Sequence, residues 1–194
     1  MNELFKDQII VVSGLPRSGT SVLMALLKKA GITLLVDQHR LPDDDNPGGY
    51  FEYEPVKNIH VSSDWIKTAR GKAVKVVSPL LEYLPSSEDY KIILMLRNCD
   101  EIYASQQVML ENRGYERRKN GDVVIKALSN QIQEIQLWIN AQTNMVVHKI
   151  DFAQLIFDPF EECKRLCNFL QLGDNVVEGM VGLVDPNRYR QRHL

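Results

Sequence analysis

One local pattern constrains the fold of this chain more than any other: an apolar run, a glycine-containing loop and an amphipathic segment follow one another directly. The run 9–12 is β-branched throughout, Gly14 and Gly19 are five residues apart, and apolar residues then recur at helical spacing up to Ala30. Glycine lets a backbone approach an anion, and the N–H groups of such a loop and of the following helix point at it. The pattern predicts a phosphate-binding loop between a strand and a helix.

The cation of this loop stands in an unusual place. In loops that bind a nucleoside triphosphate with Mg²⁺, a lysine follows the second glycine, whereas here Thr20 follows it and Arg17 lies inside the loop. Such enzymes also have a later strand ending in an aspartate that helps to hold the metal, but the apolar run 90–97 ends in Arg97. Both departures favour a ligand whose charge is neutralised by protein cations, without a metal.

Two motifs resemble those of the sulfotransferase family. Residues 15–21, Leu-Pro-Arg-Ser-Gly-Thr-Ser, are similar to its 5′-phosphosulfate loop, P-[KR]-S-G-T-[ST]. Residues 96–105 are similar to its 3′-phosphate motif, R-N/D-P-x-D-x-x-x-S, with Arg97 and Ser105 eight residues apart and Cys99 at the usual proline. The segments 46–52 and 184–190 also resemble parts of small bacterial sulfotransferase-like proteins.

The resemblance implies a sulfotransferase that transfers a sulfuryl group from 3′-phosphoadenosine 5′-phosphosulfate (PAPS) to a hydroxyl or amine acceptor, with PAPS as co-substrate and no metal. Arg17 is then the expected catalytic cation, because it would neutralise charge on the bridging oxygen. One well-placed donor contributes about 3–4 kcal/mol to such a step. The expected nucleotide-binding residues are Arg17, Ser18, Gly19, Thr20, Ser21, Arg97, Ser105 and, in a basic tail that also holds Arg188, Arg190.

Several residues are candidates for the general base that takes the acceptor proton. The sequence offers Glu52, Glu54, His39 and His60, and sulfotransferase-like proteins use either a histidine or a glutamate. We favour Glu52, because it ends the turn Gly-Gly-Tyr-Phe-Glu, whose aromatic residues suit an acceptor pocket. The alternative is that Glu52 is an acid at the start of a helix over 53–69, stabilised by the helix dipole. His148, in a strand that reads as buried, is expected to be structural.

Ser105 also stands out from its place on the segment after Arg97. The apolar stripe of that segment includes Ser105 among Ile102, Gln106, Met109 and Leu110. A buried hydroxyl without a partner costs about 1–3 kcal/mol, and many such serines bond back to their own helix. The position of Arg97 eight residues earlier favours a contact with a 3′-phosphate instead.

Candidate strands and helices alternate along the chain. Strands are expected at 8–13, 73–78, 90–97 and 145–150, with a weaker one at 32–36, and helices at 19–30, 53–69, 100–113, 122–142, 159–171 and 174–182. This alternation predicts an α/β fold, a P-loop-type three-layer α/β/α arrangement with a mostly parallel sheet of about four to five strands. Since ligands bind beyond the carboxyl ends of such strands, Arg17 and Arg97 are expected to face one crevice.

Composition narrows the functional classes further. The 194 residues predict a single domain over 1–194, and a net charge of −2 provides no general attraction for nucleic acid or membranes. No apolar run is long enough to span a membrane, and the first residues do not resemble a signal peptide. The three cysteines form no CxxC pair, and Cys163 and Cys167 are expected to be core thiols, which favours a reducing cytoplasm. The oligomeric state is left open.

Two other functions remain compatible with the sequence. One is a P-loop kinase that phosphorylates a small molecule, although the missing lysine and aspartate argue against it. The other is a non-catalytic nucleotide-binding protein that has kept the fold without turnover.

Overall fold

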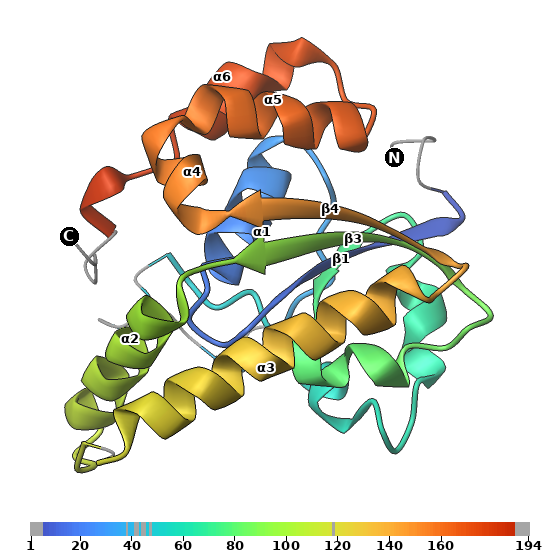
Figure 1. Ribbon diagram of the computed structural model, residues 1–194. Coiled ribbons are helices and arrows are strands. Elements are labelled where there is room, and N and C mark those ends of the chain that lie inside the picture. The colour runs from blue at the N-terminus through green and yellow to red at the C-terminus, as the bar shows by residue number, and fades with distance from the viewer. Residues whose placement is uncertain are drawn as a thin grey trace.

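The computed structural model describes residues 6–37, 39–40, 43, 46, 48–117 and 119–188. It contains a parallel sheet of four strands in the order β2-β1-β3-β4. Figure 1 shows β1, β3 and β4 side by side. The strands are β1 (Gln8–Gly14), β2 (Ala73–Lys75), β3 (Asp89–Leu96) and β4 (Met145–Asp151). The predicted α/β class and parallel sheet are therefore confirmed.

Helices cover both faces of the sheet. One face carries α1 (Thr20–Lys29), α4 (Phe152–Phe157), α5 (Pro159–Phe169) and α6 (Val177–Val181). The other carries α3 (Gly121–Asn140) and the 3₁₀ helices η2 (Glu54–Asn58), η3 (Asp64–Ala69) and η4 (Ser78–Tyr83). The helix α2 (Cys99–Asn112) follows β3 and packs beside α3 (Figure 1).

The alternating direction of the side chains along β1 explains why helices cover both faces of the sheet. Ile10 and Val12 join the core cluster under α1, whereas Ile9 and Val11 join the cluster under α3. Successive strand residues point to opposite faces, so a run that is apolar at every position requires cover on both sides. All four side chains are fully buried.

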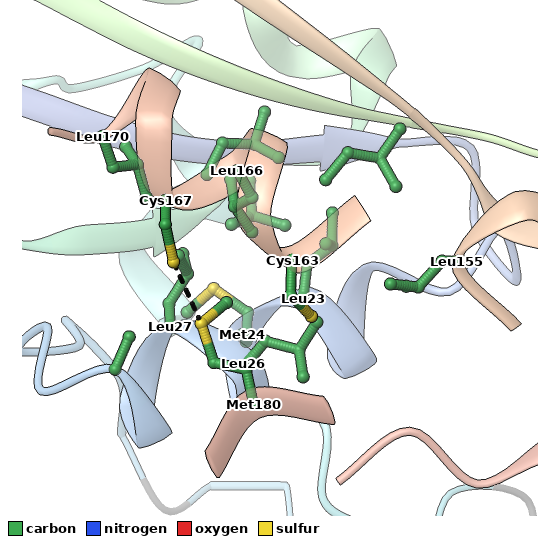
Figure 2. Close-up of a cluster of buried hydrophobic side chains, with 14 of the residues drawn as sticks. Leu23, Met24, Leu26, Leu27, Leu155, Cys163, Leu166, Cys167, Leu170 and Met180 are labelled. Atoms are coloured by element: carbon green, nitrogen blue, oxygen red, sulfur yellow. Dashed lines mark hydrogen bonds between the residues drawn. The ribbon is translucent and has the colours of Figure 1, made fainter. Parts of the chain in front are cut away.

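The core under α1 also contains the two helical cysteines (Figure 2). Cys163 and Cys167 are both fully buried and free, and the Sγ of Cys167 lies 3.6 Å from the Sδ of Met180. Burial raises the pKa of the Cys163 thiol to about 12. The prediction that both are core thiols is confirmed.

Several predicted boundaries are wrong for local reasons. The expected helix 53–69 is two 3₁₀ helices, η2 and η3, separated by a turn in which the Ser62 hydroxyl bonds to Asp64. The expected strand 73–78 ends at Lys75, although the N–H of Val76 still donates to the carbonyl oxygen of Val12 at 3.0 Å, and the chain then enters η4 at Ser78. The weaker strand 32–36 is a single bridge from Leu34 to Ala73.

The other differences lie near the carboxyl end of the described chain. The expected helix 174–182 is divided into η5 (Asp174–Val176) and α6. The short helix α4 was missed, although Asp151 caps it by accepting from the N–H of Gln154 at 3.1 Å. The last described element is η6 (Pro186–Arg188). None of the described helices combines the length and apolarity needed to cross a bilayer.

Candidate functional site

The loop between β1 and α1 has the compact form expected of a phosphate-binding loop. The N–H of Ser18 donates to the carbonyl of Leu15 at 3.0 Å, which closes the turn. Gly19 has φ 109°, and a Cβ there would lie 2.6 Å from the ring of Phe152. A Cβ on Gly14 would lie 2.8 Å from the carbonyl oxygen of Met95. Only glycine fits either position, so both glycines are explained by close packing.

The interior of this loop contains an unsatisfied donor. The Oγ of Ser18 is buried and has no hydrogen-bond partner within the described residues. A buried hydroxyl in that state costs free energy until something accepts from it. An anion at the N-terminus of α1 would supply that acceptor, which fits the residues of the loop to a phosphate or a phosphosulfate.

The two predicted motifs meet directly. Arg17 Nε donates to Ser105 Oγ at 3.0 Å, and a guanidinium nitrogen of Arg97 donates to the carbonyl oxygen of Arg17 at 3.1 Å. Gln106 adds a bond from its amide to the carbonyl oxygen of Pro16 at 3.2 Å. These contacts join residues at least 80 positions apart in sequence. Arg17 and Arg97 also line one cavity, as expected of two cations that face the same crevice.

Arg97 is held from two further sides. Its Nε lies 2.9 Å from a carboxylate oxygen of Glu101, one turn further along, and both side chains are more than nine-tenths buried. Its guanidinium also lies 4.7 Å from the ring centre of Phe152. The side chain is therefore oriented before any ligand arrives, as an anion-binding arginine requires.

A cavity of about 340 Å³ adjoins these residues. It is lined by the loop between β1 and α1, by the start of α1 and by the segment between α1 and η2. The end of β2, Val77, one face of α2 and Phe152 complete the lining. The lining residues used below are Arg17, Thr20, Ser21, Arg40, Asn46, Tyr50, Glu52, Lys75, Arg97, Ser105, Val108, Met109, Asn112 and Arg113.

Among the four candidate bases, Glu52 is the one that lines this cavity. Its two carboxylate oxygens lie 2.8 Å from Arg40 and 3.6 Å from Lys57. Arg40 in turn stacks on the ring of Tyr50, 3.3 Å from its centre. Glu52 is thus a carboxylate fixed by two cations at the wall of the cavity.

The other candidates lie elsewhere. Glu54 pairs with Lys57 at 2.7 Å and His39 with Asp37 at 3.0 Å, both with well-exposed side chains. His60 is exposed and packs against Tyr83. His148, in β4, stacks on Phe169, and burial lowers the pKa of the His148 imidazole. None of these residues lines the cavity.

Sequence reasoning missed Lys75. Its side chain is 8% exposed at the end of β2, where the Nζ lies 3.4 Å from Ser21 Oγ and donates to the carbonyl oxygen of Tyr50. Burial lowers the pKa of Lys75 to about 8. The available signal was a lysine within the otherwise apolar run 73–77, which is an uncommon place for a charge.

Ser21 connects Lys75 to Asn46, because its hydroxyl also accepts from Asn46 Nδ2 at 3.0 Å. Thr20 is buried and lines the cavity at the start of α1. The predicted contact of Arg190 lies outside the described residues. The backbone of Arg188 ends η6.

Comparison with known proteins agrees with this geometry. A search of curated proteins finds no match. Among solved structures, mouse sulfotransferase SULT7A1 in complex with PAP is similar with a TM-score of 0.61 and 14% identity, over 97% of this chain and 68% of that one. The sulfotransferase domain of the curacin biosynthetic pathway is similar with a TM-score of 0.53 and 17% identity, over 86% and 74%.

A third structure, the sulfotransferase domain of the Synechococcus PCC 7002 olefin synthase, has a TM-score of 0.54 and 13% identity, over 96% of this chain and 84% of that one. At these identities the likeness establishes the fold. The sequence model of the sulfotransferase domain matches residues 6–184, nearly the whole chain. This protein therefore belongs to the sulfotransferase family.

Proposed function

We propose that this protein transfers a sulfuryl group from PAPS to a hydroxyl or amine acceptor, as one domain over 1–194. The observation that carries the proposal is the direct contact between the two phosphate motifs through Arg17 and Ser105. PAPS has a phosphosulfate at the 5′ position and a phosphate at the 3′ position, so it needs two adjacent anion sites. A cytoplasmic location fits the free thiols Cys99, Cys163 and Cys167.

The loop and the start of α1 hold the 5′-phosphosulfate in this proposal. The N–H groups of residues 17–21 and the hydroxyls of Ser18, Thr20 and Ser21 are the donors. Arg97 and Ser105 hold the 3′-phosphate, with Arg190 as a further candidate. An arginine suits that place because its planar fork matches phosphate oxygens.

In the transfer step, Glu52 is the general base that removes the proton from the hydroxyl or amine of the acceptor. The acceptor oxygen or nitrogen then forms its bond to sulfur while the bond from sulfur to the bridging oxygen breaks. The electron pair stays on the bridging oxygen, where Arg17 neutralises the growing charge. Lys75, held beside Ser21, is a second cation at the same end of the loop. Such fixed charges act most strongly at a site that excludes water.

Ligand choice tests this function. The product 3′,5′-diphosphoadenosine (PAP) should raise the Tm of the protein without added metal, and EDTA should not reverse the effect. At 100 times its Kd the stabilisation is about 2.7 kcal/mol, which thermal unfolding detects. Stabilisation by ATP with Mg²⁺ and none by PAP would favour the kinase. Tight PAP binding without transfer to a panel of phenols, sugars, amines and peptides would favour the binding protein.

A further inference from the structure

One face of α2 forms a continuous wall of the cavity. The residues on it are Ser105, Val108, Met109, Asn112 and Arg113, at the spacing i, i+3, i+4, i+7 and i+8 that places side chains on one side of a helix. The end of this wall near Ser105 adjoins the phosphate loop. Its other end lies about 12 Å further along the helix axis, at a rise of about 1.5 Å per residue.

The chemistry of this wall changes along its length. Ser105 is polar and bonded to Arg17. Val108 and Met109 follow as an apolar stretch, and Asn112 and Arg113 make the far end polar and cationic again. A molecule lying along the wall would therefore meet donors at both ends and an apolar surface between them.

Most cations of the cavity already have partners. Arg97 pairs with Glu101 and Arg40 with Glu52, and Lys75 donates to Tyr50. Arg113 differs, because its guanidinium makes no hydrogen bond or ion pair with any described residue. The backbone of Arg113 ends α2, and its side chain is exposed at the rim.

We infer that Arg113 binds a carboxylate carried by the acceptor, whose apolar body lies on Val108 and Met109. The inference rests on the proposed transfer function. In that function, the anionic groups of the nucleotide already have sites at the loop and at Arg97 with Ser105. An unpaired guanidinium a dozen ångströms along the helix is then left for a different anion. Its planar fork matches a carboxylate, with two parallel N–H···O bonds.

The acceptor class that follows is a small hydroxylated molecule with an apolar body and an acid group at the end remote from the hydroxyl. The hydroxyl would face Glu52, which lines the same cavity. Acceptors without the acid would still reach the apolar stretch but would lack the contact at the rim. Arg113 is thus a specificity residue rather than a catalytic one.

A matched pair of probes tests this assignment: 3-(4-hydroxyphenyl)propanoate and 4-propylphenol, which differ chiefly in the acid group. We expect calorimetry to show the acid binding about fivefold to tenfold more tightly, as one exposed charge-assisted pair allows. Arg113→Gln should remove that preference and leave the affinities for 4-propylphenol and PAP unchanged. Raising the salt concentration should shrink the preference in the wild type only.

Arg117→Gln is the control. Arg117 lies in the same loop but pairs with Glu111 and does not line the cavity, so its loss should leave the preference intact. Equal binding of the two probes to the wild type overturns the inference. It is also overturned if Arg113→Gln weakens both probes alike or weakens PAP. The titrations are run with and without PAP. A protein that fails to bind PAP refutes the proposed function, whereas the preference for the acid over 4-propylphenol is measured independently of PAP binding.

Discussion

Arg17 Nε donates to Ser105 Oγ across 3.0 Å, which joins the loop after β1 to the helix after β3. The loop cation is thereby held on the hydroxyl that we assign to the 3′-phosphate. A nucleotide that occupies both anion sites must replace this bond on each side. The contact therefore joins Ser105, which we assign to the 3′-phosphate, to Arg17, which we assign to the charge that develops at the 5′ end.

Replacement of Arg17 should separate transition-state stabilisation from binding. Arg17 has φ 77°, a left-handed conformation that glycine adopts freely, so Arg17→Gly preserves the loop better than Arg17→Ala. We expect kcat to fall by about 10²–10³, as for loss of one donor at a developing charge. PAP affinity should fall far less, because that charge is greatest in the transition state. Steady-state kinetics and calorimetry give the two numbers.

Arg17→Lys provides the comparison, because it keeps a cation at this position. It should retain much more turnover than the glycine variant. If PAP affinity and kcat fall by the same factor in Arg17→Gly, the side chain contributes to binding alone.

Arg97 should discriminate ligands that carry a 3′-phosphate. Arg97→Met alone leaves the buried carboxylate of Glu101 without this partner, which costs about 3–5 kcal/mol of stability. The double variant Arg97→Met/Glu101→Gln avoids that charge and is the protein to titrate.

Loss of a charged hydrogen bond costs about 1.5–3 kcal/mol, so PAP should bind to this double variant at least tenfold more weakly than to the wild type. Adenosine 5′-phosphosulfate, which lacks the 3′-phosphate, should bind unchanged; equal weakening of both ligands would assign Arg97 to the 5′ end or to the fold.

Glu52→Gln should remove most turnover and leave PAP binding intact, because the acceptor proton is remote from the nucleotide. General base catalysis contributes about 10²–10⁴ in rate. Glu54→Gln is the matched control, since Glu54 also pairs with Lys57 but does not line the cavity. Unchanged turnover in Glu52→Gln would transfer the role of the base to another group, with Lys75 the first to be tested.

Lys75 should make stability depend on pH in the alkaline range. Its pKa is lowered by burial from 10.5 to about 8 in the folded protein, so the unfolded chain binds more protons between these two values. The contribution of Lys75 to the free energy of unfolding should therefore rise from about pH 8 to 10.5. A shift of this size corresponds to about 3 kcal/mol.

Chemical denaturation at a series of pH values checks this effect. Lys75→Met should be more stable than the wild type at pH 7 and should lack this part of the rise. Burial also lowers the pKa of Lys91 and raises that of Cys163, and both groups change stability in this pH range. The difference between wild type and variant is therefore the quantity that isolates Lys75. An identical pH profile in both proteins would show that Lys75 is hydrated in the folded state.

Much of the fold could be read from local patterns. The apolar run, the two glycines and the following helix lie within about two dozen residues, so their spacing alone specifies strand, loop and helix. The match of the sulfotransferase domain confirms the resemblance, and the four parallel strands confirm the predicted sheet. The predicted helix 53–69 failed because each of its halves is stabilised by packing on the sheet rather than by a continuous helical stripe.

Local patterns predict the loop between β1 and α1, the places of Arg17 and Arg97 after their strands, and the alternation that builds the sheet. Each depends on residues that are near neighbours in the chain. The partners of these residues depend instead on how distant segments pack together. Lys75 reaches Tyr50 and Ser21, and Arg17 reaches Ser105, across dozens of residues. Burial then lowers the pKa of Lys75 to about 8. Side-chain burial is a property of the packed chain that no local pattern contains.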